Sequence, residues 1–89
     1  MSKKMWYVYI VECRDKTLYT GITTELERRV EEHNNSDEKG ARYTRARRPV
    51  KLVYHEIVDS RGEAVKRETA IKRMKRVSKI KLLKILILC

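Results

Sequence analysis

One carboxylate, that of Glu68, is predicted to lie on an apolar face of a helix. Ala64, Glu68 and Ile71 stand at positions i, i+4 and i+7, which share one side of an α-helix. A buried carboxylate is unfavourable unless it is paired or binds a metal ion. Lys72, four residues on, could pair with it. A single carboxylate holds Mg²⁺ only when substrate phosphate and water complete the coordination shell, so an internal ion pair and a metal site both stay open.

Arg29 presents the same problem with the opposite charge. At about 100° per residue, Leu26, Val30 and His33 fall within a narrow arc, and Arg29 lies on its edge. An arginine at the border of a buried stripe either extends its guanidinium to water or meets a negative partner. If the guanidinium extends to water, the aliphatic part of Arg29 shields the core. If it meets a negative partner, Arg29 is a candidate for binding an anion.

The aromatic residues favour a polar site. The chain has five tyrosines and no phenylalanine, although phenylalanine fills a core without a hydroxyl to satisfy. Tyr7 and Tyr9 share one face of a predicted strand, and Tyr19 lies on the next strand. Gly21 follows two residues later, where a glycine permits close approach by a backbone or a ligand. Chance remains an alternative for so small a number of residues.

A basic run follows the first predicted helix. Arginine rather than lysine dominates it, and guanidinium groups bind phosphates by paired hydrogen bonds. A tyrosine within the run could stack on a base. The alternative is a flexible, solvated loop. The candidate nucleic-acid-binding residues are Arg42, Tyr43, Arg45, Arg47 and Arg48.

These residues must be positioned by a small mixed fold. Runs of β-branched and aromatic residues predict strands, and a short polar turn makes the first two strands an antiparallel hairpin. Capping boxes at Thr24 with Glu27 and at Ser60 with Glu63 predict two helix starts, and Ser78 predicts a third. We expect an α+β fold: a three-stranded, mainly antiparallel sheet flanked by three helices. The predicted strands are 6–13, 18–23 and 50–58, the helices 24–34, 60–76 and 78–88, and the long basic loop 35–49.

Charge and length narrow the class of protein. The 89 residues predict one domain over 1–89, and the net charge of +10 attracts polyanions. Nucleic acid is the first candidate partner and an anionic membrane surface the second. Cys13 and Cys89 lack the spacing of zinc ligands, which predicts free thiols and a cytoplasmic protein. No apolar stretch reaches the roughly 20 residues of a spanning helix.

The last ten residues, IKLLKILILC, are apolar on nearly all sides of a helix. Packing over the sheet is one interpretation of this segment at 80–89. The other is a surface that forms a homodimer or binds a partner protein.

The motifs, taken in order, resemble the GIY-YIG nuclease superfamily. Tyr7-Val8-Tyr9 followed ten residues later by Tyr19-Thr20-Gly21 is similar to its two name-giving segments. The segment 26–29, with His33 four residues on, resembles the first-helix signature, and 64–71 resembles the later helix with its glutamate. The resemblance spans roughly residues 5 to 80 and is closest to the small, stand-alone bacterial branch.

The resemblance implies an endonuclease that hydrolyses phosphodiester bonds in nucleic acid, DNA before RNA, with one Mg²⁺ or Mn²⁺ ion. Arg29 would stabilise charge on the scissile phosphate, and Glu68 would hold the metal ion. Tyr9 and Tyr19 would line the site, with Tyr19 the better candidate for activating water. His33 stands where the family has another polar or aromatic site residue. The alternatives are a nucleic-acid-binding module without cleavage and an interaction protein that acts through its tail.

Overall fold

The computed structural model describes residues 5–88, and its elements follow the order expected from the sequence. The first two strands form a hairpin, and the third strand of the sheet follows the basic run along the chain. A short helix within that run brings the number of helices in the described residues to four. The strands are β1 (Trp6–Glu12), β2 (Leu18–Thr23) and β3 (Lys51–Val58), and the helices are α1 (Leu26–Asn35), α2 (Arg42–Arg45), α3 (Arg61–Arg73) and α4 (Arg76–Leu88).

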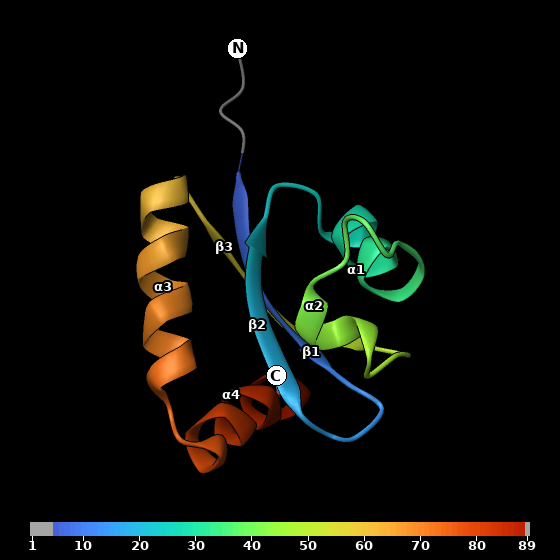
Figure 1. Ribbon diagram of the computed structural model, residues 1–89. Coiled ribbons are helices and arrows are strands. Elements are labelled where there is room, and N and C mark those ends of the chain that lie inside the picture. The colour runs from blue at the N-terminus through green and yellow to red at the C-terminus, as the bar shows by residue number, and fades with distance from the viewer. Residues whose placement is uncertain (1–4, 89) are drawn as a thin grey trace.

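The sheet has the order β2-β1-β3, and β1 pairs antiparallel with both neighbours (Figure 1). The predicted three-stranded antiparallel sheet is therefore confirmed. In the register, Tyr9 lies opposite Gly21 on one side and opposite His55 on the other. The helices cover both faces: α3 lies on one side of the sheet, and α1 with α2 on the other.

The face under α3 is an apolar core. Val8 and Ile10 of β1 are fully buried there, together with Ala64 and Ile71 of α3. The predicted stripe of α3 thus packs on the sheet as its spacing indicates. Leu82 and Leu83 of α4 also pack against this cluster.

The opposite face mixes apolar and polar side chains. Tyr9, Val11 and Cys13 of β1 are buried there with Val50, and Leu26 and Val30 of α1 cover them. His33, on the same stripe of α1, is fully buried. The predicted stripe of the first helix is therefore confirmed, with its histidine inside the protein.

Two of the predicted helix starts are wrong. The N-cap of α1 is Glu25, which makes no capping side-chain hydrogen bond. The hydroxyl of Thr23, not that of Thr24, accepts the amide of Glu25 at 3.1 Å, so the threonine that orders this turn is the last residue of β2. The last helix begins at Arg76 rather than at Ser78, after α3 has ended at Arg73.

The start of α3 follows the prediction. Its N-cap is Ser60, whose hydroxyl accepts the amide of Glu63 at 3.2 Å. This bond satisfies one of the backbone donors that a helix leaves unpaired in its first turn.

The apolar C-terminal segment forms the second part of α4, whose side chains from residue 84 on lie outside the described part of the chain, as does Cys89. The packing of Leu82 and Leu83 on the α3 core agrees with the first interpretation of this segment. Across residues 5–88, no helix combines the length and the apolar composition that crossing a bilayer demands.

Candidate active site

The site forms where β1, β2 and α1 meet on the face of the sheet opposite α3. The hydroxyl oxygen of Tyr9 lies 2.7 Å from Nε2 of His33, and the two rings are tilted with centroids 5.8 Å apart. Tyr19 of β2 meets the same imidazole edge-on, at 5.4 Å. His33 therefore contacts both tyrosines that the motif resemblance singles out.

Gly21 explains how the phenol of Tyr9 reaches its place. A Cβ atom on Gly21 would lie 2.5 Å from the hydroxyl oxygen of Tyr9 and 2.7 Å from Cζ. The ring of Tyr9 therefore crosses β2 directly over the glycine, which is its antiparallel partner. Any side chain at position 21 would displace the phenol.

Burial and charge act in opposite directions on Tyr9. Burial raises the pKa of Tyr9 to about 12, although the neighbouring Arg29 guanidinium opposes the rise by hydrogen bonding and by charge. The carboxylate of Glu68 adds a smaller contribution to the rise of this pKa. The charges of Arg29 and Glu68 thus shift the pKa of Tyr9 in opposite directions.

The guanidinium of Arg29 is held by its own helix and by the loop that follows. Its Nη1 donates to Glu32 Oε1 at 3.1 Å and to the carbonyl of Lys39. About a quarter of the side chain is exposed. Arg29 therefore borders the core as the periodicity predicts, with a negative partner rather than a simple extension to water.

Glu68 forms the ion pair that the i, i+4 spacing predicts. Its Oε2 lies 3.3 Å from Nζ of Lys72, and about a fifth of its side chain is exposed. Lys72 is about half exposed, so the pair lies at the protein surface. Among the residues that the structure describes, no group of three or more His, Cys, Asp or Glu side chains gathers into a metal site.

The basic run is ordered, which differs from the loop that we expect from the sequence. Arg48 donates to the carbonyls of His33 and Ser36 at 2.6 and 2.9 Å and pairs with Asp37 at 2.9 Å. Arg45 donates to the carbonyl of Asp37 at 2.9 Å. These bonds attach the run to the end of α1, so Arg48 serves the fold.

Tyr43 is exposed, and its ring contacts two other side chains. Its ring stacks on Tyr19 at 5.8 Å, and the guanidinium of Arg47 lies 3.9 Å from its centroid. Arg47 in turn pairs with Asp15 at 3.1 Å. Arg42, Tyr43 and Arg45 are exposed, whereas Arg47 is half-buried.

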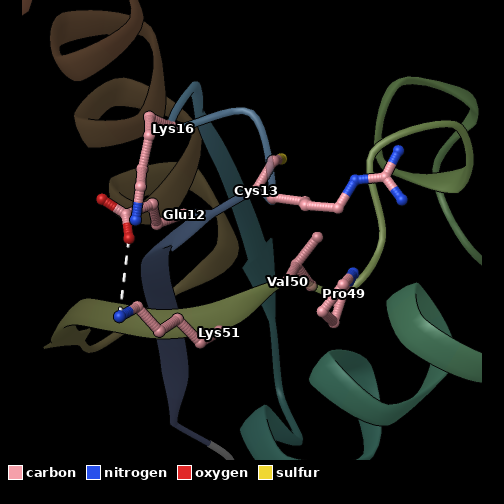
Figure 2. Close-up of a pocket in the computed structure, with 7 residues that line it drawn as sticks. Glu12, Cys13, Lys16, Pro49, Val50 and Lys51 are labelled. Atoms are coloured by element: carbon pink, nitrogen blue, oxygen red, sulfur yellow. Dashed lines mark ion pairs between the residues drawn. The ribbon is translucent and has the colours of Figure 1, made fainter.

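A hollow of about 270 Å³ lies at the turn of the hairpin (Figure 2). Glu12 pairs there with Lys51 at 3.5 Å, and Lys16 points into the same region. The buried thiol of Cys13 lines this hollow and is free, as predicted. None of the candidate catalytic residues lines it.

Thr44 is the site residue that the sequence analysis missed. It is fully buried, and its Oγ1 lies 2.9 Å from Nδ1 of His33. The signal available in the sequence was a small hydroxyl residue within the basic run, which has no meaning without the position of His33.

Comparison with known proteins identifies the family of the chain. Residues 5–81 match the GIY-YIG catalytic domain family. A UPF0213 protein of Desulfotalea psychrophila is 61% identical over 93% of this chain and 74% of its own length, and one of Syntrophus aciditrophicus is 57% identical over 94% and 93%.

Two solution NMR structures share the fold. A protein from E. faecalis superimposes with a TM-score of 0.64 at 42% identity, covering 99% of this chain and 92% of that protein. A UPF0213 protein from Bacillus halodurans gives 0.59 at 41% identity, covering 91% and 84%. The chain belongs to the GIY-YIG catalytic domain family, within its group of small UPF0213 proteins.

Proposed function

We propose that this protein is a metal-dependent endonuclease that hydrolyses phosphodiester bonds in nucleic acid, with DNA as the preferred substrate. The observation that supports this most is the convergence of Tyr9, Tyr19 and His33 in one cluster, with Arg29 on the same helix as His33. The family to which the chain belongs is named for a catalytic domain, which supports nuclease chemistry at this cluster.

Each side chain has a role that suits its surroundings. Arg29 is anchored by Glu32 and presents a charge that it does not lose, which suits a phosphoryl oxygen. Tyr19 is less deeply buried than Tyr9, so it is the better placed to contact an attacking water. Tyr9 and His33 are buried and hydrogen-bonded to one another, and His33 orients Tyr19 through a ring contact.

The carboxylate of Glu68 is suited to bind a divalent cation that keeps most of its water ligands. Mg²⁺ and Mn²⁺ accept one protein carboxylate when phosphate oxygens and waters supply the other ligands. The donor set of the described residues agrees with this mode, since Glu68 is a single, partly exposed carboxylate. When bound, such an ion would neutralise charge on the phosphate and favour ionisation of a bound water. Lys72 would have to release Glu68 Oε2 or share it.

Nucleic acid would be attracted by the overall charge rather than by the basic run alone. The net charge of +10 favours polyanions, and Arg42 and Arg45 are exposed beside the site. Arg47 and Arg48 are committed to contacts within the protein. We therefore assign phosphate contact first to Arg42 and Arg45, with a salt dependence of about −0.9 in log–log slope per phosphate contacted.

A binding module without cleavage is the second candidate. It is favoured by the ion pair of Glu68 with Lys72, which gives the carboxylate a partner without any metal ion. This alternative predicts binding to nucleic acid that EDTA does not change.

The decisive experiment includes control variants on the same two helices as Arg29 and Glu68. Labelled single-stranded, duplex and branched DNA, and RNA, are incubated with the protein in Mg²⁺, Mn²⁺ or EDTA. Arg29→Ala and Glu68→Ala should lower cleavage by at least about 100-fold, because each removes charge stabilisation that develops during the reaction. Arg28→Ala and Glu63→Ala are the matched controls, since both are exposed on the same two helices.

The controls should cut at the parental rate. Metal-independent binding without cleavage under every condition would support the second candidate. Cleavage that survives in both Arg29→Ala and Glu68→Ala would contradict the assigned roles.

A further inference from the structure

The groups around His33 favour one position for the proton on its imidazole ring. Nδ1 faces two groups from the start of α2: Oγ1 of Thr44 at 2.9 Å and the backbone N–H of Ala41 at 3.5 Å. A backbone N–H cannot rotate or act as an acceptor, so an N–H that points at Nδ1 requires a lone pair there. The amide of Ala41 thus favours an unprotonated Nδ1.

The hydroxyl of Thr44 has a choice of two acceptors. Besides Nδ1 of His33, the carbonyl of Ala41 lies 3.0 Å away. That carbonyl already accepts the amides of Thr44 and Arg45, each at 3.1 Å, and a carbonyl oxygen has two lone pairs. Donation to Nδ1 is therefore the better use of the hydroxyl proton, because it satisfies an acceptor that is otherwise held only by the long bond from Ala41.

We infer that Thr44 is a positioning residue for the proposed reaction: it holds His33 as the tautomer that is protonated at Nε2, so that His33 donates to the hydroxyl oxygen of Tyr9. The proton of Tyr9 then points away from His33. The phenol oxygen then accepts from Nε2 at 2.7 Å. This donated bond fixes the direction of the phenol's own proton, which is left to bond a group other than His33.

Because the hydrogen bond between His33 and Thr44 is buried, its loss would disturb the site. His33 and Thr44 are fully buried, so water cannot replace a lost partner at low free energy. His33 also contacts the ring of Tyr19, and Tyr43, the neighbour of Thr44 in α2, stacks on the same ring. The short helix α2 therefore orients both tyrosines, one through Thr44 and His33 and the other through Tyr43. In this proposal α2 positions the residues of the site as well as contacting phosphate.

This inference rests on the proposed function for its meaning in catalysis, but its geometry can be tested without any cleavage. Two-dimensional ¹H–¹⁵N spectra of the imidazole groups report directly which nitrogen is protonated. In the parent protein, His33 should be a neutral tautomer protonated at Nε2, with an Nε2–H signal protected from exchange. A tautomer protonated at Nδ1, or a mixture of the two, would overturn the inference.

Variants at position 44 connect the tautomer to the reaction. Thr44→Val removes the hydroxyl at constant shape, so the tautomer protonated at Nδ1 should appear or the Nε2–H should lose protection. Where the parent cleaves, kcat should fall by about 10- to 100-fold while the KM for nucleic acid stays constant, because the loss is one of orientation. Thr44→Ser keeps the hydroxyl and should restore both readouts.

The outcomes separate the two proposals. A parent without cleavage but with the Nε2-protonated tautomer, lost in Thr44→Val and restored in Thr44→Ser, would refute the endonuclease and leave the positioning role of Thr44 intact. A Thr44→Val protein that folds, keeps the parental tautomer and cuts at the parental rate would refute the role of Thr44 alone.

Discussion

The α3 face of the sheet is filled with Val8, Ile10, Ala64 and Ile71, whereas the opposite face buries a hydrogen-bonded chain from Tyr9 through His33 to Thr44. An apolar core is stabilised in proportion to the area it removes from water and depends little on direction. A buried polar chain adds little net stability, but it fixes orientation, because each unmade bond is unfavourable. One sheet thus separates stabilisation of the fold from positioning of the site.

The largest expected difference between the faces is in stability. Ile71→Ala creates a cavity in the fully buried α3 core and should lower the free energy of unfolding by about 2–5 kcal/mol. Urea denaturation followed by circular dichroism measures this change. The folded fraction should keep its tautomer at His33, because the imidazole lies on the other side of the sheet. A changed His33 tautomer in the folded variant would show that the two faces are coupled.

A second difference between the faces depends on pH. Burial, with the charges of Arg29 and Arg48, lowers the pKa of His33 from 6.5 to about 4, and Glu32 opposes this shift. The folded state therefore binds fewer protons than the unfolded state between these values. His33 stabilises the fold fully above pH 6.5, and its contribution, up to about 3 kcal/mol, is lost as the pH falls towards 4.

The measurement is urea denaturation at several pH values from 7.5 to 4. The matched control is His33→Asn, which cannot titrate in this range and should have a shallower pH dependence. Carboxyl groups such as Asp15, whose pKa is lowered by hydrogen bonds from Thr17, contribute the same sign at lower pH. Equal slopes in the parent and in His33→Asn would contradict a buried, neutral His33.

Local patterns predict the two faces unequally well. The apolar spacing of Ala64 and Ile71 in α3 and the continuous apolar run of β1 predict the apolar core directly, because these residue types match their burial. The same periodicity places His33 on the inner stripe of α1. It gives no partner for that side chain, since Tyr9 lies 24 residues and Thr44 lies 11 residues away along the chain.

The basic run shows why the rest of the site could not be predicted. Composition treats Arg42, Arg45, Arg47 and Arg48 alike, whereas the structure gives each a different environment. Arg48 is bonded to backbone carbonyls at the end of α1, which requires the chain to return past that helix. Contacts of this kind follow from tertiary folding, and no local propensity encodes them.

The smallest expected effect on stability comes from substituting one of two buried threonines. Thr20 of β2 lies on the α3 side of the sheet, opposite Ile10, and within the described residues its Oγ1 is a buried polar atom without a hydrogen-bond partner. Thr44 lies on the other side with its hydroxyl bonded to His33. Thr20→Val removes an unsatisfied polar atom at constant shape, so stability should be unchanged or should rise by up to about 1 kcal/mol.

Thr44→Val is the matched substitution and should lower stability by about 1–3 kcal/mol, because it leaves Nδ1 of His33 with the long bond from Ala41 alone. Urea denaturation of both variants under one condition gives the comparison. The same chemical change should therefore lower stability on one face of the sheet and not on the other. If Thr20→Val were as destabilising as Thr44→Val, the hydroxyl of Thr20 would have a partner such as a buried water, and the division between an apolar face and a polar, positioning face would fail.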